Sequence, residues 1–127
     1  MAWLLIFVGG GAGACARYGI GSLAGRWFGA AFPAHTLLVN VTGSFLIGLI
    51  STILIQRGVP DPAWRLAIVT GFLGGYTTFS AFSYETIQLI QDGHGGRALL
   101  YVLLSNGLGI LACALGIVAV RWSGLSG

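Results

Sequence analysis

The chain contains three long runs without a single charged side chain, at residues 27–56, 66–84 and 98–120. A helix needs about 20 apolar residues to cross about 30 Å of hydrocarbon, so each run is close to the length of a membrane span. Only 7% of all residues are charged, against about 25% in a soluble domain, and the mean hydropathy is +0.90. This composition excludes a soluble enzyme, a disordered chain and a zinc or disulfide scaffold. The solvent of this chain is mostly lipid.

A fourth apolar segment precedes these runs and is interrupted only by Arg17. We therefore predict an all-α membrane protein whose 127 residues form a single four-helix transmembrane domain. The predicted helices cover about 3–24, 34–56, 65–91 and 97–121. The third span requires that the bundle tolerate Glu85 in its interior. Pro33, Pro60 and Pro62 are expected in the connections, where proline does not disturb a helix.

The six arginines are spread singly, and the net charge of +3 forms no basic patch that would indicate a nucleic-acid partner. The end that holds both termini has Arg57, Arg65 and Arg121, whereas the opposite end has Arg26 and Arg97. Because the positive-inside rule needs a clear excess, this distribution fixes no orientation. Two interpretations stay open: one weakly determined topology, or a chain that inserts both ways and pairs with its own inverse.

Several apparent motifs in the sequence have simpler explanations. No positive region precedes the apolar N-terminal run, so we do not expect a signal peptide. Gly11-x-Gly13-x-x-Ala16 resembles a dinucleotide fingerprint, but it lacks the acid expected about 20 residues later and fits a small-residue packing face.

Cys15 and Cys113 lie in apolar runs and are predicted to act as small hydrophobic residues. His35 and His94 have no second ligand at helical spacing, so a metal site on them is not expected.

Two polar stripes follow the second and fourth spans. Thr36, Asn40 and Ser44 recur at intervals of four residues and therefore share one helical face. Polar side chains in hydrocarbon must find partners or a watery path. Ser44 is expected to bond a neighbouring helix, while Asn40, with four hydrogen-bonding sites, fits either interhelical bonding or a pore lining. The stripe on the fourth span consists of Tyr101, Ser105, Gly109 and Cys113, with Asn106 beside it.

The third span departs most from an ordinary helix. Gly74-Gly75 lowers helix stability, and the following Thr77-Thr78 can bond backbone carbonyls, so we predict a break near mid-membrane. Broken helices of this kind commonly build ion sites from freed carbonyls. After the break, Phe79 and Phe82 share one face, and positive ring edges can help to solvate an anion. Ser80 and Ser83 share the neighbouring face, and Glu85 is either near an interface or buried with a partner.

The third span resembles the signature of a known family. The residues Gly71-Phe72-Leu73-Gly74-Gly75-x-Thr77-Thr78-Phe79-Ser80-x-Phe82-Ser83-x-Glu85 are similar to those of the Fluc (CrcB) fluoride channels. Arg17, Thr36, Asn40, Tyr101 and Ser105 support the resemblance. It implies a passive channel of the bacterial inner membrane that exports fluoride and protects the cell from it. It also implies an antiparallel, dual-topology homodimer with two pores and a central structural sodium ion.

The resemblance further implies roles for individual residues. Asn40, Phe79, Phe82 and Ser105 would line the fluoride path, and the candidate path also includes Thr36, Ser80, Ser83, Tyr101 and Glu85. Gly74 and Thr77 would bind sodium through their backbone carbonyls. Arg17 would serve a vestibule or a structural role. Many family members have a hydroxyl at the position of Gly109, where Asn106 or ordered water would substitute. No organic cofactor and no nucleic acid are implied, and the bilayer and a second copy are the expected partners.

Two other classes share some of these features. A small multidrug exporter also has four helices and often inserts both ways, but it depends on an acid in the first helix, where this chain has only Arg17. A non-transporting subunit of a membrane complex would explain the glycine faces. It would not explain the broken third helix with its hydroxyls and aromatic rings.

Overall fold

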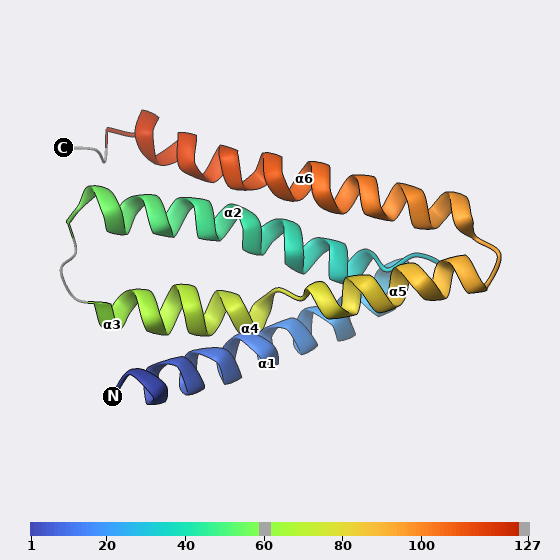
Figure 1. The fold of residues 1–127 in the computed structure, drawn as a ribbon, viewed down its shortest axis with the longest axis horizontal. Helices are drawn as coiled ribbons and strands as arrows, with labels where there is room; N and C mark the ends of the chain where they lie inside the picture. The colour runs from blue at the N-terminus through green and yellow to red at the C-terminus, as the bar shows by residue number, and fades with distance from the viewer. Residues whose placement is uncertain (59–61, 125–127) are drawn as a thin grey trace.

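Four helical rods, each antiparallel to the next along the chain, make up the described residues, and the first rod begins at the end of the molecule where the fourth rod stops (Figure 1). The computed structural model describes residues 1–58 and 62–124. Its elements are α1 (Ala2–Phe28), α2 (Ala34–Gln56), α3 (Pro62–Trp64), η1 (Arg65–Leu73), α4 (Gly74–Tyr76), α5 (Phe79–Gln91) and α6 (Gly95–Trp122). The third rod is composite, because it contains α3, η1, α4 and α5 (Figure 1).

Four helical segments in the described residues are long and apolar enough to cross a membrane. They are Ala2–Phe28, Ala34–Gln56, Pro62–Gln91 and Gly95–Trp122. The protein is therefore a multi-pass membrane protein built entirely from helices.

The prolines differ in part from the expectation. Pro62 begins α3 instead of lying in the connection, because the first helical turn has no use for the missing N–H and favours the fixed φ of proline. Pro33 directly precedes α2, at its N-cap. The prediction for Pro60 lies outside the described residues.

Glycines allow α1 to lie directly against η1 and α4. A Cβ at Gly9 would collide with the carbonyl oxygen of Ala67, and one at Gly13 with that of Phe72. Gly75 lies in the same way against the backbone of Gly10. The small residues of α1 thus serve as a packing face, which brings the helices to a backbone separation that only glycine permits.

Helices α2 and α6 also approach each other closely at glycines. Gly48 of α2 lies against the carbonyl group of Cys113, and Gly116 of α6 lies against the carbonyl oxygen of Phe45. A Cβ at Gly109 would stand 3.6 Å from Ser44 Oγ. The polar stripe of α2 therefore faces the stripe of α6 along part of their length.

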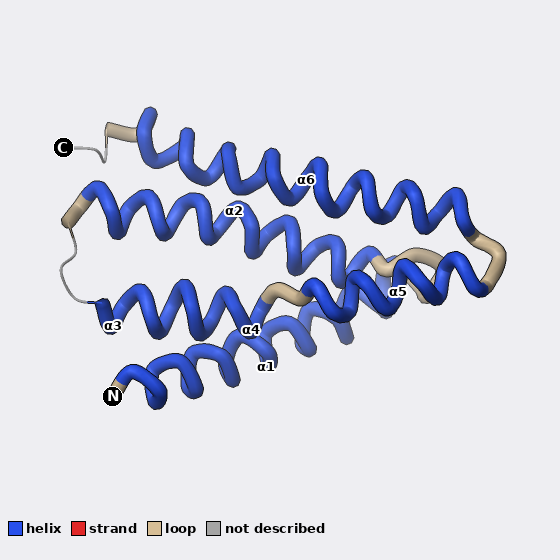
Figure 2. The backbone as a smooth tube through the Cα atoms, viewed as in Figure 1, coloured by secondary structure: helices blue, strands red, loops and turns tan. Residues whose placement is uncertain are grey.

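The third rod is irregular in two places. Residues Arg65–Leu73 are wound as a π-helix, and α4 ends at Tyr76, directly before Thr77, which has extended backbone angles (φ −85°, ψ 157°). Thr78 is also extended (φ −150°, ψ 118°) and caps the start of α5. Figure 2 shows these two residues as a short non-helical stretch between α4 and α5.

Candidate functional site

Asn40 holds the non-helical stretch of the third rod in place. Its Nδ2 donates to the carbonyl oxygen of Thr78 at 2.9 Å, and its Oδ1 accepts from the amide of Thr78 at 2.8 Å. The carboxamide thus replaces both backbone partners that a helix would give Thr78. Asn40 bonds the non-helical stretch of a neighbouring rod and also lines a cavity, so a bond between rods and a place in a cavity wall do not exclude each other.

Two amide hydrogens near this stretch are taken by side chains. In a continuous α-helix the amide of Thr78 would bond the carbonyl of Gly74, and that of Ala81 would bond the carbonyl of Thr77. Here the first binds Asn40, and the second binds Thr78 Oγ1 at 3.2 Å. The carbonyls of Gly74 and Thr77 therefore lose their normal helical donors.

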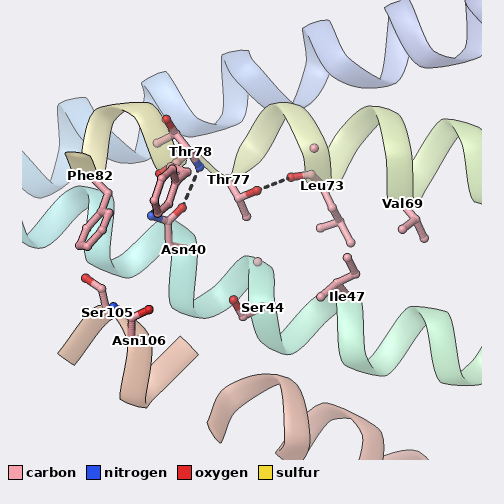
Figure 3. Close-up of a pocket in the computed structure, with 13 residues that line it drawn as sticks. Asn40, Ser44, Ile47, Val69, Leu73, Thr77, Thr78, Phe82, Ser105 and Asn106 are labelled. Atoms are coloured by element: carbon pink, nitrogen blue, oxygen red, sulfur yellow. Dashed lines mark hydrogen bonds between the residues drawn. The ribbon is translucent and has the colours of Figure 1, made fainter. Parts of the chain in front are cut away.

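A cavity of about 360 Å³ lies beside this stretch (Figure 3). Residues from α2, the composite third rod and α6 form its wall. They are Asn40, Gly43, Ser44, Ile47, Val69, Leu73, Gly74, Thr77, Thr78, Phe79, Phe82, Ser105 and Asn106. None of these side chains carries a charge. We call this space the central cavity.

Ser105 supplies the one hydroxyl of the described residues that is buried without a hydrogen-bond partner. It projects from α6 toward the central cavity, opposite Phe82 (Figure 3). The neighbouring Asn106 already donates through Nδ2 to the carbonyl of Val102 at 2.8 Å. Since a buried hydroxyl without a partner is costly, a further hydrogen bond to Ser105 would be favourable.

Aromatic rings form a connected group along one side of the cavity. The centroids of Phe79 and Phe82 are 5.6 Å apart, and Phe82 meets Tyr101 edge to face at 5.1 Å. Tyr101 in turn meets Phe32 at 5.5 Å. Phe79 is 78% exposed in the single chain, so one of the two cavity rings has no packing partner on its outer side in this chain.

Glu85 is partly buried and has partners. Its carboxylate accepts from Thr36 Oγ1 at 2.8 Å and from the hydroxyl of Tyr101 at 2.7 Å, while His35 Nε2 lies at 3.5 Å. Thr36, Tyr101 and Glu85 thus form a compact cluster, which does not line the central cavity. Phe82 is the link between the two, because it lines the cavity and packs on Tyr101.

The remaining candidates lie elsewhere. Ser83 donates to the carbonyl of Phe79 at 2.9 Å, and Ser80 bonds Thr78 at 3.3 Å between hydroxyls. Neither lines the central cavity. Arg17 lines a separate cavity of about 610 Å³ between α1, α2 and α5, together with His35 and Glu85.

The cavity therefore brings together six predicted residues, namely Asn40, Gly74, Thr77, Phe79, Phe82 and Ser105. Sequence reasoning did not assign its apolar wall, to which Ile47, Val69 and Leu73 belong. Ile47 stands seven residues after Asn40, on the helical face that Asn40 and Ser44 share. That spacing could have indicated from the sequence that Ile47 lies on the same wall as Asn40. The π-helical turns that place Val69 and Leu73 left no comparable signal.

Comparison with known proteins identifies the family. The model of the CrcB-like protein, Camphor Resistance (CrcB) family matches residues 4–117. A relative from Acidobacterium capsulatum, named fluoride-specific ion channel FluC, is 51% identical over 118 residues, which cover 93% of this chain and 94% of the relative. Relatives of the same name from Solibacter usitatus (48%; 95% and 99% covered) and Coxiella burnetii strain Dugway 5J108-111 (48%; 93% and 96% covered) are similar. The chain belongs to the CrcB family, which is a family of ion channels and not of enzymes.

Proposed function

We propose that this protein is a fluoride-selective, passive channel that exports fluoride across the bacterial inner membrane. The observation that carries the proposal is the central cavity, whose wall has hydrogen-bond donors and aromatic rings but no charged side chain. Fluoride is strongly hydrated, so a narrow path must replace water by donors. It must also let the ion leave, and a fixed cation in the path would hold it too tightly.

Donors for the ion come from α2 and α6. Ser105 has a buried hydroxyl without a partner among the described residues. Asn40 uses one Nδ2 hydrogen for Thr78, which leaves its second Nδ2 hydrogen for an anion. These two groups line the same cavity, and together they replace part of the ion's hydration shell.

The rings of Phe79 and Phe82 complete the lining. Ring edges carry partial positive charge, and edge-on rings therefore attract an anion without binding it as firmly as an arginine. Thr36, Tyr101 and Glu85 extend the path beyond Phe82, and Ser80 and Ser83 lie beside it. The hydroxyls of Thr36 and Tyr101 bond Glu85 in the single chain, so they must turn away from the carboxylate to donate to fluoride.

Two copies of the chain assemble as an antiparallel homodimer with two pores. The central cavity is not fully enclosed in the single chain, and the exposed ring of Phe79 lies at its wall. A second copy would cover both the opening of the cavity and the ring of Phe79.

Arginines are nearly balanced between the two ends of the chain, at Arg57, Arg65 and Arg121 against Arg26 and Arg97. Insertion in both orientations follows, because the positive-inside rule then favours neither one.

A central sodium ion fits the donor chemistry of the third rod. The carbonyls of Gly74 and Thr77 lose their helical donors to side-chain competitors, and a small hard cation favours oxygen ligands. No cluster of three or more His, Cys, Asp or Glu side chains that could hold a metal occurs in the described residues. Sodium bound by these carbonyls of both copies would fix the two subunits in register.

Flux from proteoliposomes tests the proposed function. Purified protein is reconstituted, and efflux of fluoride and of chloride is recorded separately with ion-selective electrodes. We expect fluoride efflux that dissipates its own gradient, needs no added energy source and far exceeds chloride efflux. Proton uptake driven by a drug gradient would instead indicate a multidrug exporter, and no transport of any kind would indicate an accessory subunit.

A further inference from the structure

A second cavity, of about 420 Å³, lies between α2 and α6, beyond the central cavity and toward the end that holds both termini. Its wall comes from the second halves of these two helices. The lining residues are Ile47, Gly48, Ser51, Thr52, Ile55, Gln56, Cys113, Ile117 and Arg121. We call this space the α2–α6 cavity.

Ile47 lines both the central cavity and the α2–α6 cavity. Ile47 is the one residue that the linings of the two cavities share. From Ile47 to Gln56, at the end of α2, the helix rises roughly 13 Å. This is close to half of the about 30 Å of hydrocarbon, so the α2–α6 cavity covers the distance that separates the central cavity from the membrane surface.

The outer end of the α2–α6 cavity is basic. Arg121 lies in the last turn of α6 and is exposed. In residues 1–58 and 62–124 the one close contact between a basic and an acidic side chain joins His35 and Glu85, so no described carboxylate neutralises Arg121. Further donors are Ser51 and the amide of Gln56, while the hydroxyl of Thr52 is committed to the carbonyl of Gly48 at 2.6 Å.

We propose that the α2–α6 cavity is the access chamber of the fluoride path on the side of the chain ends, with Arg121 as its anion-attracting mouth and Ile47 as its apolar constriction. A cation at a mouth raises the local concentration of anions and hence their rate of entry. An apolar constriction controls passage through its width and its wetting. This inference rests on the proposed function, because it assigns an entrance and a neck to the same path.

The first test removes the charge at the mouth. Arg121→Gln is compared with Arg65→Gln, which removes an exposed arginine at the same end but outside the cavity. Initial fluoride efflux is measured at low fluoride in low and high salt. We expect Arg121→Gln to lower the rate about fivefold in low salt and less in high salt, since exposed charges are screened. Equal rates for the two variants would overturn the role of Arg121.

The second test changes the width at Ile47. Ile47→Ala is expected to raise fluoride efflux, and Ile47→Phe to lower it about tenfold or more, because the wall between the cavities is widened or filled. Ile110→Phe is the matched control, since Ile110 is 72% exposed on α6 and lines neither cavity. Efflux that is unchanged in both Ile47 variants, with the dimer intact by size exclusion, would contradict a constriction at this position.

The native cysteines give a third test, which does not use transport. Cys113 lines the α2–α6 cavity, whereas Cys15 is exposed on α1, outside it. Permeabilised proteoliposomes of Cys15→Ala and Cys113→Ala are treated with a small, charged thiol reagent. We expect it to label Cys113 in the first variant, and to label the second variant, in which Cys113 is absent, much less.

The outcomes separate this inference from the proposed function. Wild-type protein that releases no fluoride contradicts the proposed function itself. Wild-type protein that conducts fluoride, while Cys113 stays unlabelled and Arg121→Gln and Ile47→Phe behave as their controls, contradicts the access chamber alone.

Discussion

At the scale of single residues, the site depends on which polar groups are already bonded and which are not. Asn40 is bonded on both sides of its carboxamide, and the hydroxyls of Thr77 and Ser83 bond backbone carbonyls. Ser105 alone among the described residues has a buried side-chain oxygen without a partner. Residue type and spacing singled out Asn40 in the sequence, whereas the family resemblance implied the role of Ser105. Neither showed that Asn40 would be bonded to Thr78, because that depends on the extended conformation of Thr78.

The aromatic rings provide a prediction at the same scale. Phe79→Ile and Phe82→Ile keep most of the volume and the hydrophobicity but remove the partial positive ring edge. We expect fluoride efflux from proteoliposomes to fall about tenfold or more, with the dimer still assembled. Phe7→Ile is the control, because Phe7 is 79% exposed on α1 and lines neither the central nor the α2–α6 cavity. Unchanged efflux in both cavity variants would show that these rings serve packing only and do not contact fluoride.

At the scale of elements, the composite third rod departs most from what a sequence can predict. Gly74-Gly75 and Thr77-Thr78 indicated an irregular helix, and extended backbone lies at Thr77 and Thr78. The π-helix at Arg65–Leu73 was missed, and α1 packs closely against this segment through Gly9 and Gly13. Tertiary packing of that kind has no periodicity in the sequence of the third rod itself.

Packing of α1 leads to a prediction for its glycines. Gly13→Ala places a Cβ against the backbone of Phe72, whereas the matched change Gly11→Ala meets nothing within 4 Å. We expect Gly13→Ala to lower stability by about 1–3 kcal/mol, the usual cost of overpacking, and Gly11→Ala to have little effect. Thermal unfolding in detergent, followed by loss of the monodisperse peak, measures both. Equal midpoints would show that α1 can shift to make room.

The proposed sodium ion gives a prediction for the third rod. The expected ligands are backbone carbonyls, so Thr77→Ser should retain the ion and also the bond from this side chain to Leu73. Gly74→Val should disturb the non-helical stretch and weaken assembly. Replacing sodium by a bulky organic cation should lower fluoride efflux or the thermal midpoint of the dimer. If efflux and midpoint both persist, the carbonyls of Gly74 and Thr77 hold no sodium.

At the scale of the whole molecule, hydrophobic runs and charge positions predicted four spans, and the described residues contain four helices able to cross a membrane. The separation of the polar candidates into a central cavity and a cluster at Glu85 was not predictable. It depends on how α5 restarts at Phe79 after two extended residues, which changes the face that each later side chain presents.

Orientation in the membrane gives a prediction for the whole chain. Reporter fusions at the C-terminus should be active on both sides of the membrane, because the arginines favour neither orientation. Two arginines inserted after Gly93, at the end opposite to the chain ends, should shift the fusions strongly toward one side. A reporter that is active on one side only in the unmodified chain would contradict insertion in both orientations.

The central claim is that fluoride passes through the central cavity and bonds the hydroxyl of Ser105. The most direct measurement is the initial fluoride efflux of Ser105→Ala beside that of Thr86→Ala. Thr86 is the matched control, because its hydroxyl is committed to the carbonyl of Phe82 at 2.7 Å. A hydrogen bond to a charged group contributes about 1.5–3 kcal/mol, so we expect Ser105→Ala to slow efflux about tenfold or more and Thr86→Ala to leave it nearly unchanged. Equal efflux from the two variants would contradict a fluoride path along Ser105.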